Sequence, residues 1–463
     1  MSQKRPNVVF VFPDEYRQQA FGFMGEDPVL TPNLDRFASE SLVLTHAVSN
    51  RPLCSPYRAM LFTGKYPHAN RVLTNCNSRT RPYDNQLHGE DRCLSDVLHE
   101  AGYCQGYIGK LHLECPDEQA ARYGEGPRRD GVVWDAYTPP GPRRHGFDFW
   151  HSYGCCDWHF DPHYWVGEAA VDERIEPGEW SVKHETDVGV DYIRNTAGQR
   201  DPSRPFSLFI AHNPPHMPFD EVPERYVRMY DGKTPAELLN RPNVRLEGQG
   251  AAAERDVKSY FAAVTGIDEQ FGRILQALED EGLADETIVV FSSDHGEMMG
   301  SHAFMGKVHA YDESLLMPFI IRWPGRIAPR RDDLLLSAPD ILPTLLGLAG
   351  LADRTPPDVQ GSDHTGVVLG REGDRPTSAL YLNVGPDDPA GGARGLRTHR
   401  YTFVVRRGEG GADGVRLFDN GEDKYQRTDV AAERPGVVAE LTEQMNAWLR
   451  KTGDPWLTGD PDG

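Results

Sequence analysis

VKSYFAAVTGIDEQFGRILQALEDEGLADETIVVFSSD, residues 257–294, contains the pattern that decides the fold. Its first part has the apolar spacing of a long amphipathic helix, a glycine turn follows, and the last part reads as a strand buried on both faces. The apolar runs NVVFVF (7–12) and FSLFIAHN (206–213) have the same strand character. Strands alternating with helices predict an α/β fold with a mostly parallel sheet and helices on both faces.

Other segments extend this pattern. TPNLDRFASES (31–41) predicts a capped helix, CLSDVLHEAGYCQGYIGK (93–110) a helix and then a strand, and SAPDILPTLLGLAGL (337–351) another helix. Segment 116–205 has weak periodicity and many Pro, Gly, His and Trp residues. We expect it to form long loops over one face of the sheet.

The character of the chain changes near residue 365. SALYLNV, GLRTHRYTFVVRR and GVRLFDN read as short strands separated by Gly and Asp clusters, and GVVAELTEQMNAWLRK reads as a terminal helix. We therefore predict two units. Residues 1–365 would form the large α/β domain, and residues 366–463 a smaller unit with an antiparallel sheet and a terminal helix.

Composition restricts the classes of partner. The chain has 463 residues, with 70 Asp and Glu against 49 Lys and Arg, and a formal net charge of −21. This excess argues against nucleic acid or an anionic membrane, although a few local cations can still bind a small anionic substrate. No apolar run is long enough to span a bilayer, and the opening residues lack the features of a signal peptide, so we expect a cytoplasmic protein. The seven cysteines are expected to stay reduced.

Charged side chains follow the predicted strands where each strand ends. Asp14 and Glu15 follow the first strand, and Asp294 and His295 follow the strand at the end of the opening stretch. In open α/β sheets, ligands bind outside the carboxyl ends of the strands. Three carboxylates and one imidazole at this edge suit a divalent cation. The alternative is that each acid caps the helix that follows it.

The stretch RPLCSPYRAMLFTGKYPH, residues 51–68, carries a specific motif. It resembles the signature of the formylglycine-dependent sulfatases of the alkaline phosphatase superfamily, which is Cys-x-Pro-x-Arg followed by Thr-Gly and a basic residue. GKLHL, NPPHMPF, VVFSSDHGEMMGSH and GKVHAYDESLLMPFIIRWPG resemble further segments of that family, in the family's order. The likeness runs over nearly the whole chain and is thinnest in segment 116–205.

The resemblance implies a sulfatase with an alkaline phosphatase-like fold. A formylglycine-generating enzyme would convert Cys54 to an aldehyde, with Pro56 and Arg58 as recognition marks. One hydroxyl of the hydrated aldehyde would attack sulfur, and the other would later expel sulfate. The substrate would be a small anionic sulfate ester, such as a sulfated sugar.

The resemblance also implies roles for individual residues. Metal ligands around residue 54 would be Asp14, Glu15, Cys54, Asp294 and His295. Calcium is the expected metal, and the nitrogen of His295 leaves manganese or magnesium open. Glu15 stands where Asp or Gln is common in the family.

Further residues of the matched motifs would act on the substrate. Arg58 and Lys110 would steady the nucleophile and the anionic oxygens. His112 would be the base of the elimination step, and His216 and Lys307 would contact sulfate and help to protonate the leaving alcohol. His212 is a nearby alternative to His216, which fits the Pro-His-x-Pro pattern better.

Two other expectations concern the surroundings of this site. Segment 145–168, HGFDFWHSYGCCDWHFDPHYWVGE, is rich in aromatic and histidine residues. It could wall the substrate pocket, with a Trp on a sugar ring, or form a small satellite core. Asn75 and Arg79 follow the motif helix and could also reach the substrate.

Three alternative functions share parts of this pattern. Phosphonate monoester and phosphodiester hydrolases use the same scaffold and the same formylglycine. A catalytically silent binding homologue would lack one of the residues named above, and none is missing. A phosphomutase or phosphatase of the wider superfamily would use Ser or Thr as nucleophile, and Cys54 argues against that.

Overall fold

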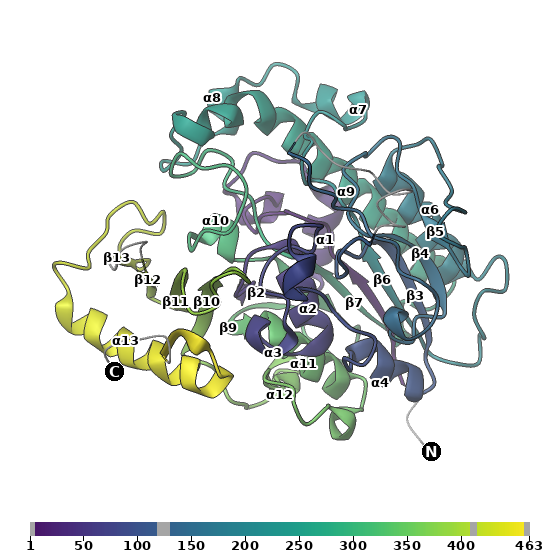
Figure 1. Ribbon diagram of the computed structural model, residues 1–463. Coiled ribbons are helices and arrows are strands. Elements are labelled where there is room, and N and C mark those ends of the chain that lie inside the picture. The colour runs from purple at the N-terminus through teal and green to yellow at the C-terminus, as the bar shows by residue number, and fades with distance from the viewer. Residues whose placement is uncertain (1–4, 118–129, 408–413, 458–463) are drawn as a thin grey trace.

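The computed structural model describes residues 5–117, 130–407 and 414–457, and its centre is a nine-stranded sheet (Figure 1). The strand order is β5-β4-β3-β6-β1-β7-β8-β2-β9. In chain order the strands are β1 (Asn7–Val11), β2 (Leu42–Val48), β3 (Cys104–Lys110), β4 (Phe149–Tyr153), β5 (Trp165–Val166), β6 (Phe206–Ala211), β7 (Thr287–Ser292), β8 (Phe319–Arg322) and β9 (Arg330–Ser337). Only β5 and β8 run antiparallel to their neighbours. The predicted α/β class is confirmed.

Strand β1 shows why the sheet is covered on both faces. All five of its residues are buried, and β6 and β7 pair with it in parallel on either side. Val9 and Val11 pack into one hydrophobic cluster, whereas Phe10 and Phe12 pack into another. The period of two along the strand therefore sends alternate side chains to two separate helical layers.

Helices form these two layers. One layer packs with Val9 and Val11 and contains α1 (Pro32–Ser39), α6 (Ser181–Arg194), α7 (Glu224–Val227), α8 (Pro235–Leu238) and α9 (Ala253–Asp280). The other layer contains α2 (Cys54–Thr63), α4 (Leu94–Glu100), α11 (Ile341–Leu348) and α12 (Thr365–Val368), and α3 (Pro67–Asn70) lies against α2. The short α10 (Asp312–Leu315) lies between the central sheet and the C-terminal strands (Figure 1).

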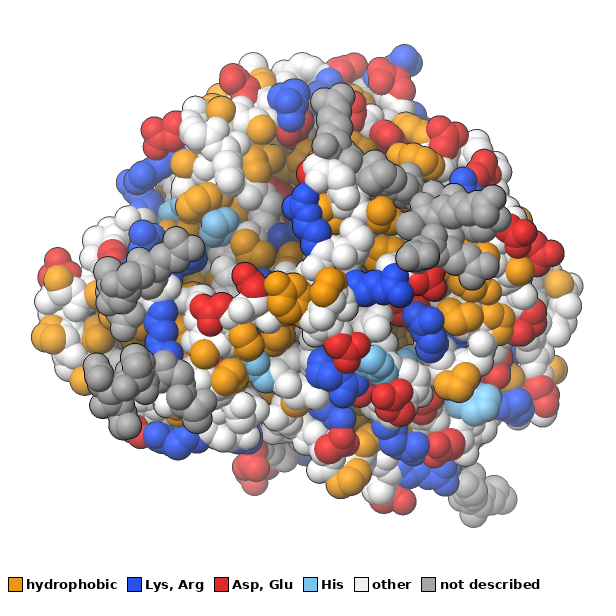
Figure 2. Space-filling view, viewed as in Figure 1, with side chains coloured by type: hydrophobic (Ala, Val, Ile, Leu, Met, Phe, Trp, Pro, Cys, Tyr) orange, Lys and Arg blue, Asp and Glu red, His pale blue; other side chains and the backbone are white. Residues whose placement is uncertain are grey.

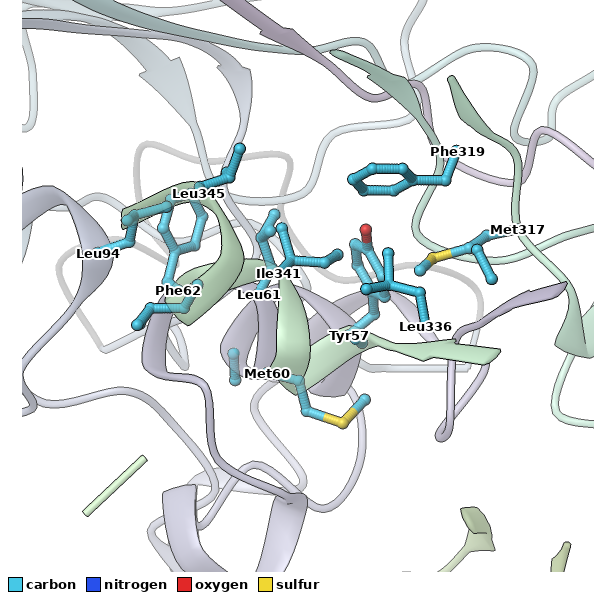
Figure 3. Packing of buried hydrophobic residues seen from close by; sticks show 14 of the residues in the cluster. Tyr57, Met60, Leu61, Phe62, Leu94, Met317, Phe319, Leu336, Ile341 and Leu345 are labelled. Carbon is cyan, nitrogen blue, oxygen red and sulfur yellow. The ribbon is translucent and has the colours of Figure 1, made fainter. Parts of the chain in front are cut away.

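Helix α2 is buried over its whole length, so it presents side chains to neighbours on every side. Figure 3 shows its apolar residues among those of β8, β9, α4 and α11. Tyr57 lies near Phe319 and Leu336, while Phe62 lies near Leu94. This packing fixes the helix whose first residue is Cys54.

The C-terminal part forms an antiparallel sheet and a long helix, as predicted. The sheet contains β10 (Ser378–Asn383), β11 (Ala393–Thr398), β12 (Tyr401–Arg406) and β13 (Gly414–Asp419), and α13 (Pro435–Thr452) covers one side. Leu380, Leu396 and Leu449 belong to the same hydrophobic cluster as α2, so the two sheets share a core. The division after residue 365 stays a prediction, and α12 begins at that residue.

Segment 116–205 differs from the prediction of long loops. Residues 118–129 lie outside the described residues, but the remainder contains β4 and β5 at the sheet edge and the 14-residue helix α6. The inward positions of α6 include Glu185, Thr186 and Gly189, which interrupt the apolar spacing. The prediction was wrong there because polar and small residues face the core.

Two further observations concern the whole described chain. Each of the seven cysteines is buried and free of a disulfide. No helix in the three described ranges combines the length and the apolar character that a bilayer crossing requires.

Candidate active site

Parallel strand register brings distant charged residues to one edge of the sheet. Val11 of β1 pairs with Phe291 of β7, and Asp14 and Asp294 each lie three residues farther along. The Asp14 amide donates to the carbonyl of His212, just beyond β6, at 2.9 Å. Lys110 ends β3, which is the next strand. The charged residues at this edge therefore come from the carboxyl ends of four adjacent strands, β3, β6, β1 and β7.

Three side chains surround Cys54. One ligand atom from each of Asp14, Cys54, Asp294 and His295 lies within 4.8 Å of the others, and all four residues are buried. Cys54 Sγ lies 3.5 Å from Asp14 Oδ1 and 3.4 Å from His295 Nε2. His295 Nδ1 lies 3.0 Å from the Gly296 carbonyl, so donation there leaves the Nε2 lone pair facing the cluster. Two carboxylates and one imidazole lone pair in this arrangement fit a divalent cation.

Arg58 and Lys110 hold the carboxylates in place. Arg58 lies four residues after Cys54 on α2, so both face the same side of the helix. Its Nη2 lies 3.2 Å from Asp14 Oδ2 and 3.2 Å from Asp294 Oδ2, and Lys110 Nζ lies 2.7 Å from Asp14 Oδ2. These side chains are fully buried, so the pairs have little screening by water.

The Glu15 carboxylate contacts a second group of charges. Its Oε2 lies 2.9 Å from Lys307 Nζ and 3.4 Å from His216 Nε2. With Asp14 and His216 it forms another group of closely spaced ligand atoms that excludes Cys54. Its role as a ligand beside residue 54 stays a prediction.

A pocket of about 270 Å³ opens onto this arrangement. Its lining residues are Glu15, Cys54, Asn75, Lys110, His112, Trp134, Cys155, Asp157, His216, Met217, Gly306 and Lys307. The predicted catalytic residues thus meet in one cavity, except that Arg58 lies behind Cys54 and Asp14. Asn75 belongs to the lining, and its side chain accepts a hydrogen bond from the Ser55 amide at 3.1 Å.

His112 is oriented by the backbone. Its Nε2 lies 3.0 Å from the Cys76 carbonyl, and its buried Nδ1 has no hydrogen-bond partner within the described ranges. Burial lowers the pKa of His112, and Lys110 and Arg58 lower it further, to about 3. The ring is therefore neutral near pH 7, with one nitrogen available as a proton acceptor.

The cations also act on the thiol. Burial raises the pKa of Cys54, as does Asp14, but Lys307 and Lys110 lower it, and the resulting pKa is about 6. Burial, together with Lys307 and Lys110, holds the pKa of His216 well below its usual value. The pocket therefore favours negative charge at residue 54 and on a bound ligand.

Asn213 is a site residue that the sequence reasoning missed. Its Oδ1 accepts from Lys110 Nζ at 3.0 Å, while its Nδ2 lies 3.2 Å from both Asp157 Oδ1 and His159 Nε2. Asp157 Oδ1 also lies 3.6 Å from His216 Nδ1. Asn213 and Asp157 thus link Lys110 to His216 across the pocket. The available signal was the position of Asn213 two residues after the end of β6, in the segment of His216.

Two other predicted residues lie away from the pocket. His212 Nδ1 lies 2.6 Å from Glu185 Oε2, so this buried histidine has a structural partner on α6. Arg79 is exposed and donates to the Asp130 carbonyl at 2.5 Å. Neither residue is in the pocket lining.

Segment 145–168 contains both residues of a small hydrophobic cluster and residues that line the pocket. Tyr153, Cys156, Tyr164 and Trp165 form a small separate hydrophobic cluster. Cys155 and Asp157 instead line the pocket. The satellite core is confirmed for the first four residues, whereas contact with substrate and the placing of a Trp on a sugar ring stay predictions.

Figure 2 shows acidic and basic side chains interspersed over one face of the molecule, without a continuous surface of either sign. The net charge of −21 therefore does not exclude an anionic ligand. The cations that matter to such a ligand are those in the pocket, Lys110 and Lys307.

Comparisons with known proteins agree with this arrangement. The family model described as Sulfatase matches residues 6–351, and that described as the C-terminal part of N-sulphoglucosamine sulphohydrolase matches residues 300–452. An endo-4-O-sulfatase of Bacteroides thetaiotaomicron is 42% identical over 488 residues, covering 98% of this chain and 94% of that protein. A solved structure from work on glycosaminoglycan metabolism by the same species has a TM-score of 0.90 at 42% identity, covering 98% of both chains.

The fold is also found in another class of hydrolase. The phosphonate monoester hydrolase of Agrobacterium radiobacter has a TM-score of 0.68 at 23% identity, covering 98% of this chain and 97% of that chain. This likeness concerns the fold alone.

Proposed function

The chain belongs to the sulfatase family, enzymes that hydrolyse sulfate esters, and on that premise we propose that it removes an O-sulfate from a sugar. The observation that carries the proposal is the meeting of Cys54 with Asp14, Asp294 and His295, next to a pocket whose lining includes Cys54 and two lysines. We further propose that Cys54 is converted to formylglycine by a formylglycine-generating enzyme.

Asp14, Asp294 and His295 would hold the divalent cation, which we propose to be calcium. Their donor atoms suit it, because carboxylate oxygens predominate and the imidazole offers a lone pair. Such an ion would polarise a sulfate oxygen. Arg58 and Lys110 keep the carboxylates fixed through the buried pairs described above. Glu15 is the remaining proposed ligand.

The side chains around the pocket divide the remaining tasks. Lys110, Lys307 and His216 would donate hydrogen bonds to sulfate oxygens and to the bridging oxygen as the alcohol leaves. His112 Nδ1 would accept the proton released when sulfate departs, because its other nitrogen is committed to the Cys76 carbonyl. Formylglycine at position 54 would supply the attacking hydroxyl and the second hydroxyl that elimination needs.

The substrate class is proposed from the relatives. The endo-4-O-sulfatase is similar over nearly the whole chain, so a 4-O-sulfated sugar is the first ester to test. Asp157 at the pocket edge supports a polyhydroxylated alcohol, because its carboxylate can accept hydrogen bonds from hydroxyl groups.

The test begins with mass spectrometry of protein made together with a formylglycine-generating enzyme. Trypsin does not cleave between Arg51 and Pro52, so Cys54 lies in peptide 37–58. Conversion lowers its mass by about 18 Da and should accompany sulfate release from 4-O-sulfated sugars.

Cys54→Ala is the matched control, because it retains the fold and cannot be converted. A Cys54→Ala protein as active as its parent would refute the assignment of the nucleophile. Faster hydrolysis of a phosphonate monoester than of any sulfate ester would refute the substrate class. Metal analysis of the purified protein tests calcium against manganese and magnesium.

A further inference from the structure

From Asp157 to Phe160, buried and exposed side chains alternate along the chain. Asp157 and His159 are buried, with 6% and 2% of their surfaces exposed. Trp158 and Phe160, between and after them, are 41% and 37% exposed. Asn213 Nδ2 lies 3.2 Å from both Asp157 Oδ1 and His159 Nε2, so these two side chains are anchored inward while the two aromatic side chains stay at the surface.

Hydrogen bonds hold this segment against the one that carries His216. Asn213 Nδ2 donates to the Cys156 carbonyl at 2.7 Å. The Glu221 carboxylate accepts from the amides of His159 at 2.5 Å and Phe160 at 3.3 Å. The two segments therefore run side by side, and the exposed rings sit on a fixed backbone rather than on a free loop.

Met217 adds a third apolar side chain to the same place. It is 46% exposed and also lines the pocket. Asp157, which directly precedes Trp158, lines the pocket as well. Three of the large hydrophobic residues exposed in the described structure thus lie on two adjacent segments at the pocket. Exposed apolar groups gathered in one place indicate a binding surface.

The pocket itself is small for a ligand site, at about 270 Å³. A sulfated sugar that enters it must leave any further sugar outside. Sugar rings carry apolar C–H faces and hydroxyl edges. A site that binds them therefore combines flat aromatic side chains with a nearby hydrogen-bond acceptor. Trp158 and Phe160 supply the rings, and Asp157 supplies the acceptor between them and the pocket.

We propose that Trp158, Phe160 and Met217 form a subsite for a second sugar ring, linked by a glycosidic bond to the sulfated sugar in the pocket. The enzyme then acts preferentially on sulfated oligosaccharides rather than on monosaccharide or aryl sulfates. This inference rests on the proposed function and specifies its substrate.

The experiment compares two substrates that carry the same 4-O-sulfated sugar, once as a monosaccharide and once within a tetrasaccharide. Trp158→Ala and Phe160→Ala should each lower kcat/KM for the tetrasaccharide about three- to tenfold, mainly through KM. Activity on the monosaccharide should stay within about twofold of the parent, since catalysis is untouched. Trp158→Phe, which keeps a ring, should restore most of the preference.

Met229→Ala is the matched control, because Met229 is 51% exposed on the short helix Arg228–Tyr230 and does not line the pocket. It should change neither activity. The inference is overturned if Trp158→Ala lowers both activities equally, or if the tetrasaccharide and the monosaccharide are hydrolysed equally well by the parent.

A binding measurement separates this inference from the proposed function. In the Cys54→Ala background the ester is not consumed, and calorimetry gives the Kd of each sugar. The subsite is supported if the tetrasaccharide binds more tightly than the monosaccharide and if Trp158→Ala abolishes this difference. That conclusion stands even if the parent hydrolyses no sulfate ester. Equal Kd values with and without the ring at position 158 refute it.

Discussion

Replacing Glu313 by glutamine removes a buried negative charge with almost no change in side-chain shape. Glu313 lies on α10 and is 1% exposed. Its Oε1 accepts from Arg241 Nη2 at 2.9 Å and from Asn243 Nδ2 at 2.7 Å. Burial raises the pKa of Glu313, but Arg241 and Asn243 lower it by more, to about 2 from an ordinary value of 4.5.

The size of the effect follows from this pKa. The lowering of the pKa of Glu313 from 4.5 to about 2 on folding corresponds to about 3 kcal/mol of stability at neutral pH. Breaking a buried ion pair typically costs about 3–5 kcal/mol. The lower end applies here, because Arg241 Nη1 also pairs with Glu26 at 2.7 Å. We expect Glu313→Gln to lower the free energy of unfolding by about 3 kcal/mol at pH 7.

The pH dependence has a definite sign. Because the pKa in the folded protein is lowered, the contribution is complete above a pH of about 4.5 and is lost as the pH falls toward about 2. At pH 3.5 the difference between parent and variant should therefore shrink to about 2 kcal/mol.

Equilibrium unfolding in guanidinium chloride, followed by tryptophan fluorescence at pH 7 and pH 3.5, measures both values. Glu440→Gln on the exposed side of α13 is the matched control and should stay within about 0.5 kcal/mol of the parent. A loss below about 1 kcal/mol at pH 7 would refute the reasoning about the buried pair. A loss at pH 3.5 as large as at pH 7 would refute the assignment to the Glu313 charge.

Three further predictions concern the active site. Arg58→Met leaves the carboxylates of Asp14 and Asp294 buried without the guanidinium that both contact. In chelator-treated protein it should lower the free energy of unfolding by about 3–5 kcal/mol. A denaturation midpoint equal to that of the parent would contradict this. Chelation should abolish sulfate release and lower the Tm of the parent but not that of Asp294→Asn, and an identical shift in both would argue against Asp294 as a ligand. Asn213→Leu removes the acceptor that orients Lys110 and should lower kcat/KM about 10- to 100-fold, whereas an unchanged kcat/KM would show that Lys110 needs no such support.

The sequence predicted the part of the site that depends on strand ends and on helical spacing. A parallel sheet places the carboxyl ends of its strands at one edge, so Asp14, Lys110 and Asp294 had to lie close together. Cys54 and Arg58 are four residues apart in a segment that forms a helix, which puts them on one face. Both arguments use local rules, and both need only that the elements exist.

The remainder depends on contacts between segments that have no regular pattern. Asn213 stands in the sequence AHNPPH, where an asparagine before two prolines is typical of an ordinary turn. Its bonds to Lys110 and Asp157 arise only when β3, β4 and β6 are side by side. Helix α6 was missed because Glu185 faces the core, where it pairs with His212. A polar residue at a buried position interrupts the apolar spacing by which a helix is recognised in a sequence.

The burial of Cys54 would set a time limit on the conversion that we propose for it. Its side chain is 1% exposed once the chain is folded, and β1, the first strand to be made, takes its place between β6 and β7. The ribosome must add about 240 residues after Cys54 before Asp294 exists, which takes roughly 12–50 s at typical synthesis rates. A modifying enzyme therefore has that interval to reach the thiol before the sheet closes around it. The converted fraction would then depend on the rate of modification relative to the rate of translation, and we expect slower translation to raise the yield of active enzyme.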